Sequence, residues 1–419
     1  MGAEVIYLSF DGMTDPLGRS QVLPYLARLA ARGHHIRLVS LEKPAAFDRD
    51  WTTADAICRA AGIEWWPLPY RTRPPIASGI ANLRALRREA ERLHLERPAD
   101  FSHCRADLPA IAGLALKRRH GLPLLYDMRA FWPDERAEGG AWDQRKRLYR
   151  AIFRFFKKWQ RALIAEADEL VTLSEEGRRA LLALGIRPAE KPVTVIPCCA
   201  DFDLFVPPAP EARREARARL GLADDARLLI HLGSIGANCL LEEMLDFFAV
   251  YRERHPEARF LFVAPSGEGA IRAAADQRGV ADAVDVRSAN REEVPGWLAA
   301  ADLGIMFVRP VWSKKAASPT KLGEMLAMEL PVLANTGVGD VAEILDETGG
   351  GVAVGDFDAE TFRSAIDSLR NLTHSREEVR RAARRWFDLA SGIALYDQIY
   401  RRLADPRPAD LSNSTTTGP

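Results

Sequence analysis

The sequence lacks the features that define several broad classes of protein, and each absence excludes a class. Its 419 residues include five cysteines, which are too few and too scattered for a disulfide scaffold. The adjacent pair Cys198 and Cys199 does not have the spacing of zinc ligands. We therefore interpret the cysteines as buried thiols.

The chain also lacks an excess of charge and a long apolar run. The 58 Lys and Arg residues balance 58 Asp and Glu residues, which argues against a nucleic-acid binder held by bulk charge. No stretch approaches the roughly 18 apolar residues of a membrane span, and the segment before Asp11 has no basic start and too short an apolar run for a signal peptide. We expect a cytoplasmic protein, at most attached to the inner face of a membrane.

What is present is an ordinary globular composition, with 47% hydrophobic and 28% charged residues. Short apolar runs alternate with amphipathic segments of helical length, which predicts α/β domains with parallel sheets. A proline-rich stretch at 205–210 separates two such halves. We predict a first domain at 1–203, a second at 204–385, a closing helix at 386–405 that packs back on the first domain, and a disordered tail at 406–419.

Two glycine-containing loops follow predicted strands at matching places in the two halves. One runs from Asp11 to Ser20 and includes Gly12 and Gly18, and the other begins at Gly233 and Ser234. Such loops expose backbone N–H groups that suit phosphate or sugar oxygens, although ordinary turn chemistry explains each loop equally well. Ligands of open parallel sheets bind beyond the carboxyl ends of the strands, so both loops are candidate binding elements.

The segment 316–332 is the most informative. Ser318 and Pro319 mark the entry to a helix, and we expect Lys321 and Glu324 in or near its first turn, where the helix dipole favours an ionised carboxylate. That carboxylate can accept hydrogen bonds from the vicinal hydroxyls of a ribose. The alternative is plain capping by Ser318 or Thr320.

Taken together, these motifs resemble those of family 4 glycosyltransferases, which are retaining enzymes of the GT-B fold. The resemblance covers about residues 4–402 and includes the first loop, the turn Gly33-His34-His35-Ile36, the hinge from Val195 to Asp201, and the donor segment Ser318-Pro319-Thr320-Lys321-Leu322-Gly323-Glu324. It implies two Rossmann-like domains that face a cleft. It also implies transfer of a hexosyl group from a nucleotide sugar to a hydroxyl of a glycan, glycolipid or small molecule.

The resemblance assigns roles to individual residues. It implies catalytic roles for His103, Arg129, Lys321 and Glu324. It implies donor binding by Gly18, Gly233, Ser234, Arg287, Ser318, Thr320, Lys321, Leu322 and Glu324. On the acceptor side we expect Asp11, Arg105, Asp127, Trp132 and Glu135, for which a self-contained ion-pair network is the alternative interpretation.

The sequence departs from the family pattern in two places. Ala316 stands where many members have a first Glu, and the Arg and Lys that often follow the second glycine loop are missing. We therefore expect Lys321, with Lys314 or Lys315, to meet the phosphate charge of a UDP-, GDP- or dTDP-sugar. Asp201 and Asp203 form a DxD pattern, but it lies at the hinge, so we expect no metal cofactor. The alternative functions are a sugar-nucleotide 2-epimerase and an inactive GT-B partner subunit.

One predicted helix is unusually rich in basic residues. Residues 145–161 contain eight basic residues and no acidic residue. The basic residues form a stripe at helical spacing, with apolar and aromatic residues largely opposite. The segment is a candidate for docking on an anionic membrane surface, and the alternative is a solvated basic face on a packed helix.

Overall fold

The computed structural model describes residues 2–223 and 226–405. These residues form two compact units. The first unit contains residues 2–126, 167–169 and 393–405, and the second contains residues 127–166, 170–223 and 226–392. The predicted boundary after residue 203 lies within the second unit, between the last strand of one sheet and the first strand of the other. The predicted disordered tail lies outside the described residues.

The described strands form two sheets, which confirms the predicted α/β class. The first sheet has the order β3-β2-β1-β4-β5-β6-β7 and the second the order β10-β9-β8-β11-β12-β13. The strands of the first sheet are β1 (Glu4–Ser9), β2 (His35–Glu42), β3 (Glu64–Pro69), β4 (Phe101–Arg105), β5 (Leu124–Asp127), β6 (Glu169–Thr172) and β7 (Val193–Val195). Those of the second are β8 (Leu228–Leu232), β9 (Arg259–Val263), β10 (Val284–Arg287), β11 (Leu303–Met306), β12 (Val332–Asn335) and β13 (Gly351–Val354). β1 pairs in parallel with β2 and β4, and β8 pairs in parallel with β9 and β11.

Helices connect these strands, because parallel strands require crossover connections. Along the chain to residue 203 they are α1 (Pro16–Gln21), α2 (Leu23–Ala30), α3 (Pro44–Ala60), α4 (Pro75–Glu96), α5 (Asp107–His120), α6 (Trp132–Glu138), α7 (Arg147–Glu166) and α8 (Glu175–Leu182). After it come α9 (Pro210–Arg219), α10 (Leu241–Arg254), α11 (Glu268–Gln277), α12 (Val294–Ala300), α13 (Thr320–Ala327), α14 (Val341–Thr348), α15 (Ala359–Arg370), α16 (Arg376–Phe387) and α17 (Leu389–Ala404). Two short 3-10 turns, η1 (Ala281–Ala283) and η2 (Trp312–Ala316), complete the described elements.

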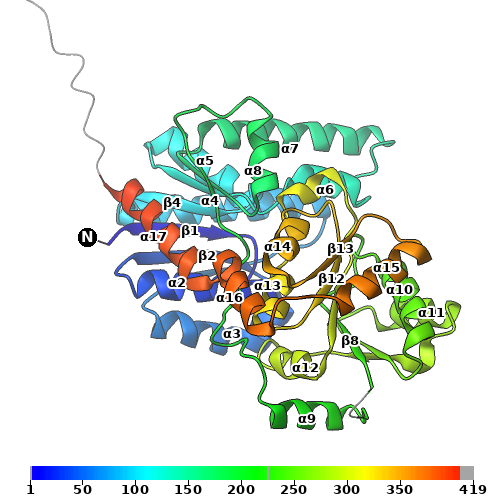
Figure 1. Ribbon diagram of the computed structural model, residues 1–419. Coiled ribbons are helices and arrows are strands. Elements are labelled where there is room, and N and C mark those ends of the chain that lie inside the picture. Colours follow the sequence, from blue (N-terminus) through cyan, green and yellow to red (C-terminus); the bar gives the residue numbers. More distant parts are fainter. Residues whose placement is uncertain (1, 224–225, 406–419) are drawn as a thin grey trace, which may run out of the picture. The chain divides into compact units, whose positions relative to one another are not determined.

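The second sheet is covered on both faces. Successive residues of its strands point to opposite sides, so Ile230 and Leu261 join one apolar cluster while Leu229 and Phe260 join another. The first cluster includes side chains of α12, α13, α14 and α16, and the second includes those of α10, α11 and α15. Figure 1 shows these two sets of helices on opposite sides of the sheet.

The structure differs from the sequence prediction in the region before β4. Between β1 and β2 the alternation of strands and helices predicts one helix, but the chain forms two, α1 and α2, because Val22 leaves the helical conformation and Pro24 has no N–H to donate to the preceding turn. The elements α3 and β3 were not predicted. β3 contains Pro67 and Pro69, which argue against a strand by sequence but are tolerated here because β3 is an edge strand.

The C-terminal half of α17 belongs to the first unit. Tyr400 is fully buried, and its ring packs edge-on against Phe101 of β4 and His34 at centroid distances of 4.9 and 5.0 Å. Asp397 accepts a hydrogen bond from the His34 ring at 2.7 Å. The last helix is therefore part of the core that contains the first strands of the chain.

Candidate functional site

The loop after β1, in the first unit, is held by Glu42, which the sequence analysis did not single out. Its carboxylate accepts hydrogen bonds from the N–H groups of Met13 at 2.8 Å and Thr14 at 3.1 Å, and from Thr14 Oγ1 at 2.6 Å. A Cβ atom on Gly12 would lie 2.6 Å from Glu42 Oε2, so only glycine allows this approach. A carboxylate at the end of an otherwise buried strand is the signal that could have identified Glu42.

Gly18 has a packing role in the same loop. A Cβ atom added to it would lie 2.1 Å from the carbonyl oxygen of Gly12. The start of α1 can therefore lie directly on the loop. The donor-binding role of Gly18 stays a prediction.

Strand β4 places His103 and Arg105 in different surroundings. His103 is buried, with its Nδ1 atom 2.8 Å from the Tyr400 hydroxyl and its ring 4.5 Å from the ring of Tyr7. Arg105 ends the strand, and its Nε atom lies 3.3 Å from Asp11 Oδ2. The structure thus brings Asp11 and Arg105 together beyond the ends of β1 and β4 but buries His103 against α17. The catalytic role predicted for His103 and the acceptor role predicted for the other two residues remain predictions.

In the second unit, Lys321 lies against the glycine that follows β8. Gly233 has a φ angle of +106°, and a Cβ atom on it would lie 3.1 Å from Lys321 Nζ. The Gly233 N–H donates to the Val263 carbonyl at 2.9 Å, so the free backbone of this loop begins at the exposed Ser234. Burial lowers the pKa of Lys321, whereas the nearby Glu324 carboxylate raises it.

His231, on β8, lies within the field of the Lys321 charge. Its Nδ1 atom is 3.0 Å from the Ile305 carbonyl oxygen, which accepts a hydrogen bond from the ring N–H. Burial, and then the Lys321 charge, hold the His231 pKa well below its usual range. A neutral imidazole therefore lies beside a cationic lysine at this end of the sheet.

Glu324 is paired with Arg291, a residue that was not predicted. Arg291 Nη1 donates to Glu324 Oε1 at 2.9 Å, and the guanidinium lies 5.4 Å from the centre of the Phe205 ring. Glu324 is the fifth residue of α13, beyond the first turn, so the guanidinium rather than the helix terminus is its principal positive neighbour. Arg287, which was predicted to contact the base, is exposed at the end of β10, and its side chain donates to the Val286 carbonyl.

The start of α13 is not capped by a side chain. Its N-cap residue is Pro319, and Ser318 Oγ instead accepts a hydrogen bond from the Cys198 N–H at 3.1 Å. The plain capping alternative is therefore wrong. Thr320 is partly exposed, whereas the Leu322 side chain is fully buried in the core, so only its backbone could serve a donor.

Ala316 is tightly packed. It is fully buried at the end of η2, and a Cβ atom added to Gly177 of α8 would lie 2.8 Å from the Ala316 Cα. Helix α8 therefore approaches the backbone at the position where many relatives of the predicted family have a first glutamate.

Asp127 and Glu135, two predicted acceptor residues of the second unit, have ionic partners, as in the alternative interpretation. Arg129 Nη1 lies 3.3 Å from Asp127 Oδ1, and Arg129 Nη2 lies 3.0 Å from Cys198 Sγ. Glu135 pairs with Lys314 and accepts a hydrogen bond from Asn238 at 3.3 Å. Lys314 thus already has a carboxylate partner.

Trp132 forms an aromatic cluster. Its ring packs edge-on against Trp142 at 5.2 Å and Phe156 at 5.0 Å. These contacts join α6 to α7. Packing is therefore sufficient to explain an aromatic residue at position 132. The acceptor role of Trp132 stays a prediction.

The DxD pattern forms a local turn. Asp201 Oδ1 accepts a hydrogen bond from the Asp203 N–H at 3.1 Å. Among residues 2–223 and 226–405 there is no group of three or more His, Cys, Asp or Glu residues arranged to hold a metal ion. In the same residues, no helix combines the length and apolar character needed to cross a bilayer.

Two family models match consecutive parts of the chain. Residues 19–199 match a glycosyl transferase 4-like domain, and residues 226–371 match the glycosyl transferases group 1. A D-inositol 3-phosphate glycosyltransferase from Kineococcus radiotolerans is 26% identical over 96% of this chain and 94% of its own length. Another, from Thermobispora bispora, is 31% identical, but the match spans only 49% of each protein.

Solved structures share the fold. Sucrose-phosphate synthase from Thermosynechococcus elongatus has a TM-score of 0.75 at 18% identity, covering 96% of this chain and 99% of that one. Anabaena HepE, in complex with UDP and glucose, has a TM-score of 0.70 at 14% identity, covering 95% and 99%. The fold is therefore GT-B, as the sequence motifs predicted. With a 4-like domain in its first half and a group 1 domain in its second, the chain belongs to the glycosyltransferases of the GT-B type.

Proposed function

We propose that the chain is a retaining hexosyltransferase of family 4, with its donor motif at 318–324. It transfers a sugar from a nucleoside diphosphate sugar to a hydroxyl acceptor. The observation that carries this proposal is the position of Lys321, whose ammonium group lies against Gly233 at the uncapped start of α13. A desolvated cation beside free helix N–H groups suits a diphosphate.

Glu324 supplies the second part of the proposed donor site. Its carboxylate has one oxygen on Arg291 and lies on the same helix as Lys321, one turn further along. A carboxylate held in this way can accept a hydrogen bond from a ribose hydroxyl. The proposed phosphate and ribose sites would then lie about one helical turn apart on α13.

The proposed reaction needs charge stabilisation more than a strong nucleophile. The bond between the anomeric carbon and the diphosphate oxygen breaks, and negative charge develops on the leaving group, where the ammonium of Lys321 stabilises it. The acceptor oxygen bonds to the anomeric carbon on the same face, and its proton passes to the leaving phosphate. No metal takes part in this scheme.

The comparisons suggest which compounds to test first. HepE has been solved in complexes with UDP and UDP-glucose, so UDP-sugars are the first donors to test. Relatives are named for D-inositol 3-phosphate, so an inositol phosphate is the first acceptor. GDP- and dTDP-sugars complete the donor set.

The test is a thermal-shift screen with these donors, followed by product analysis. A donor at about 100 times its dissociation constant should stabilise the fold by roughly 2.7 kcal/mol. Lys321→Gln should abolish the shift, while Lys146→Gln, which changes an exposed lysine just before α7, should leave it unchanged. Consumption of the donor without an acceptor would indicate an epimerase instead, and no shift with any donor would indicate an inactive partner subunit.

A further inference from the structure

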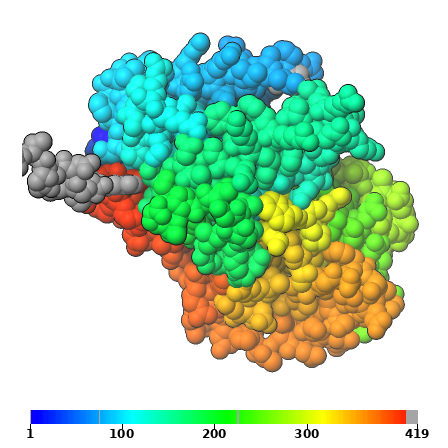
Figure 2. All heavy atoms as spheres, turned by 90° about the horizontal axis from the view of Figure 1, so that it is seen from above, coloured from blue at the N-terminus to red at the C-terminus, as the bar shows by residue number. Residues whose placement is uncertain are grey.

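Helix α7, in the second unit, presents a basic surface to solvent. Its exposed side chains include Arg147, Arg150, Arg154, Lys158 and Arg161, which we call the basic face. Spacings of three, four and seven residues place them on one side of the helix. In Figure 2, the turquoise spheres of this segment are in view at the surface.

Two large apolar side chains lie on the same exposed side. Leu148 is 59% exposed and Phe155 is 56% exposed. They are seven residues apart, so they lie two turns apart along one edge of the basic face. The sequence predicted that the apolar residues would lie opposite the charges, and Leu148 and Phe155 do not. The half-buried Phe156, by contrast, packs against Trp132 and Trp142.

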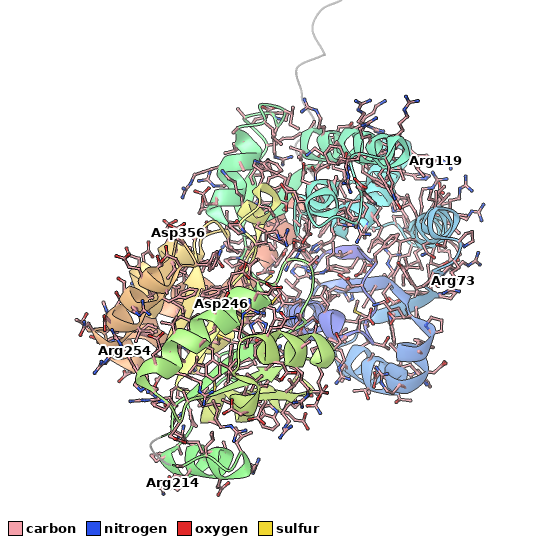
Figure 3. All side chains as sticks on the ribbon, turned by 90° about the vertical axis from the view of Figure 1, so that its right-hand side faces the viewer. Arg73, Arg119, Arg214, Asp246, Arg254 and Asp356 are labelled. Carbon is pink, nitrogen blue, oxygen red and sulfur yellow. The ribbon has the colours of Figure 1, made fainter. Side chains whose placement is uncertain are left out.

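The positive charge of this surface is not neutralised locally. Within the described residues, no carboxylate forms a salt bridge with Arg147, Arg154, Lys158 or Arg161. Helix α10 shows the contrast, since its Asp246 pairs with Arg278 at 2.5 Å and its Arg254 pairs with Asp367. Figure 3 labels Asp246 and Arg254. In a chain with no net charge, α7 therefore concentrates positive charge that lacks a protein partner.

We propose that α7 is the element by which this protein docks on an anionic lipid bilayer, with the basic face on the headgroups and Leu148 and Phe155 inserted among the acyl chains. Exposed cations beside exposed apolar side chains fit the boundary between headgroups and hydrocarbon. A soluble polyanion would meet the charges but leave the apolar pair in water. The proposal does not depend on which donor or acceptor the enzyme uses.

The test is flotation of the full chain with vesicles of phosphatidylcholine containing 30% phosphatidylglycerol, against vesicles of phosphatidylcholine alone. We expect binding to the anionic vesicles at low salt, weaker binding at high salt because the charges are screened, and no binding to the neutral vesicles. The triple change Arg147→Gln, Arg154→Gln and Arg161→Gln should weaken binding on the order of 100-fold. The pair Leu148→Ser and Phe155→Ser should also weaken binding, at unchanged net charge.

A matched control changes three exposed arginines of α16, namely Arg376→Gln, Arg381→Gln and Arg385→Gln. It removes the same charge and should bind as the unchanged protein does. Equal losses for the α7 and α16 variants, or no flotation with anionic vesicles, would overturn the proposal. Unchanged binding of the Leu148 and Phe155 variant would do so as well, because it would show that the surface binds polyanions without inserting in lipid.

Discussion

Arg291 pairs with Glu324, the carboxylate that we propose binds the ribose. Glu324 is only 7% exposed, and Arg291 Nη1, at 2.9 Å, donates a hydrogen bond to its Oε1 atom. We predict that Arg291→Gln weakens binding of the donor by about 10- to 100-fold, in line with the loss of a hydrogen bond to a charged group. Calorimetric titration with the donor would measure it. Arg272→Gln is the control, because it also removes an arginine paired with a glutamate, and an equal loss there would contradict the role of Arg291.

His231 makes stability depend on pH. The folded protein keeps it neutral, whereas the unfolded chain binds a proton near pH 6.5. Its contribution to stability is therefore fully present above pH 6.5 and is lost as the pH falls below that value. Below pH 6.5 the loss for one histidine grows by at most about 1.36 kcal/mol per pH unit, until the pH reaches the lowered pKa of the folded state.

The measurement is the free energy of unfolding in urea at several pH values. His231→Gln should show a shallower fall between pH 7 and 5 than the unchanged protein. Burial also lowers the pKa values of His34, His94 and His255, so part of the fall should remain. Identical pH profiles would contradict the assignment to His231.

Functional residues could be predicted where their partners lie close to them in the sequence. Lys321 and Glu324 could be found because they lie in one short motif at the start of a helix. Arg291 could not, because its partner lies 33 positions away and no short pattern joins the two. Glu42 could be suspected from its place at the end of a buried strand, but not the loop that it holds, which lies 28 positions away. The burial of the Leu322 side chain in the same motif as Lys321 could not be predicted, because sequence does not show which side of a helix turns to the core.

At the scale of elements, a buried hydrogen bond connects α17 with β4. Tyr400→Phe removes the hydroxyl 2.8 Å from His103 Nδ1 and keeps the ring in its packing. We predict a loss of about 1 kcal/mol in the free energy of unfolding. A double-mutant cycle with His103→Asn checks the pair, since Tyr400→Phe should cost less in that background. Equal costs in both backgrounds would mean that the hydroxyl acts through another group.

The elements with regular apolar runs could be predicted, and the irregular ones could not. Strands such as β8 and β9 are buried on both faces, so they are continuous apolar runs with a clear signal. β3 is an edge strand with two prolines, and α3 buries only Ala54 and Cys58, so neither shows a strong period. Exposure of Phe155 on α7 depends on where α6 packs, which a helical repeat cannot reveal.

At the scale of the whole molecule, the proposed donor site leads us to predict that donor binding needs no divalent metal ion. Donor charge would be met by Lys321 and helix N–H groups, and Asp201 is engaged in its own turn. The donor-induced rise in melting temperature should therefore be the same with EDTA as with added Mg²⁺ or Mn²⁺. Asp203→Asn, in an exposed position, should not change it. A rise that requires a divalent ion would contradict the scheme.

The return of α17 to the first unit bears on how the protein is made. Residues 393–405 leave the ribosome some 300 residues after Phe101 and His103, yet they help to bury both. During that interval the first strands have an incomplete core, while the sheet of β8 to β13 can already assemble. The part synthesised first is therefore the part completed last, and a nascent chain stopped at residue 392 should be held by chaperones that bind exposed aromatic surface.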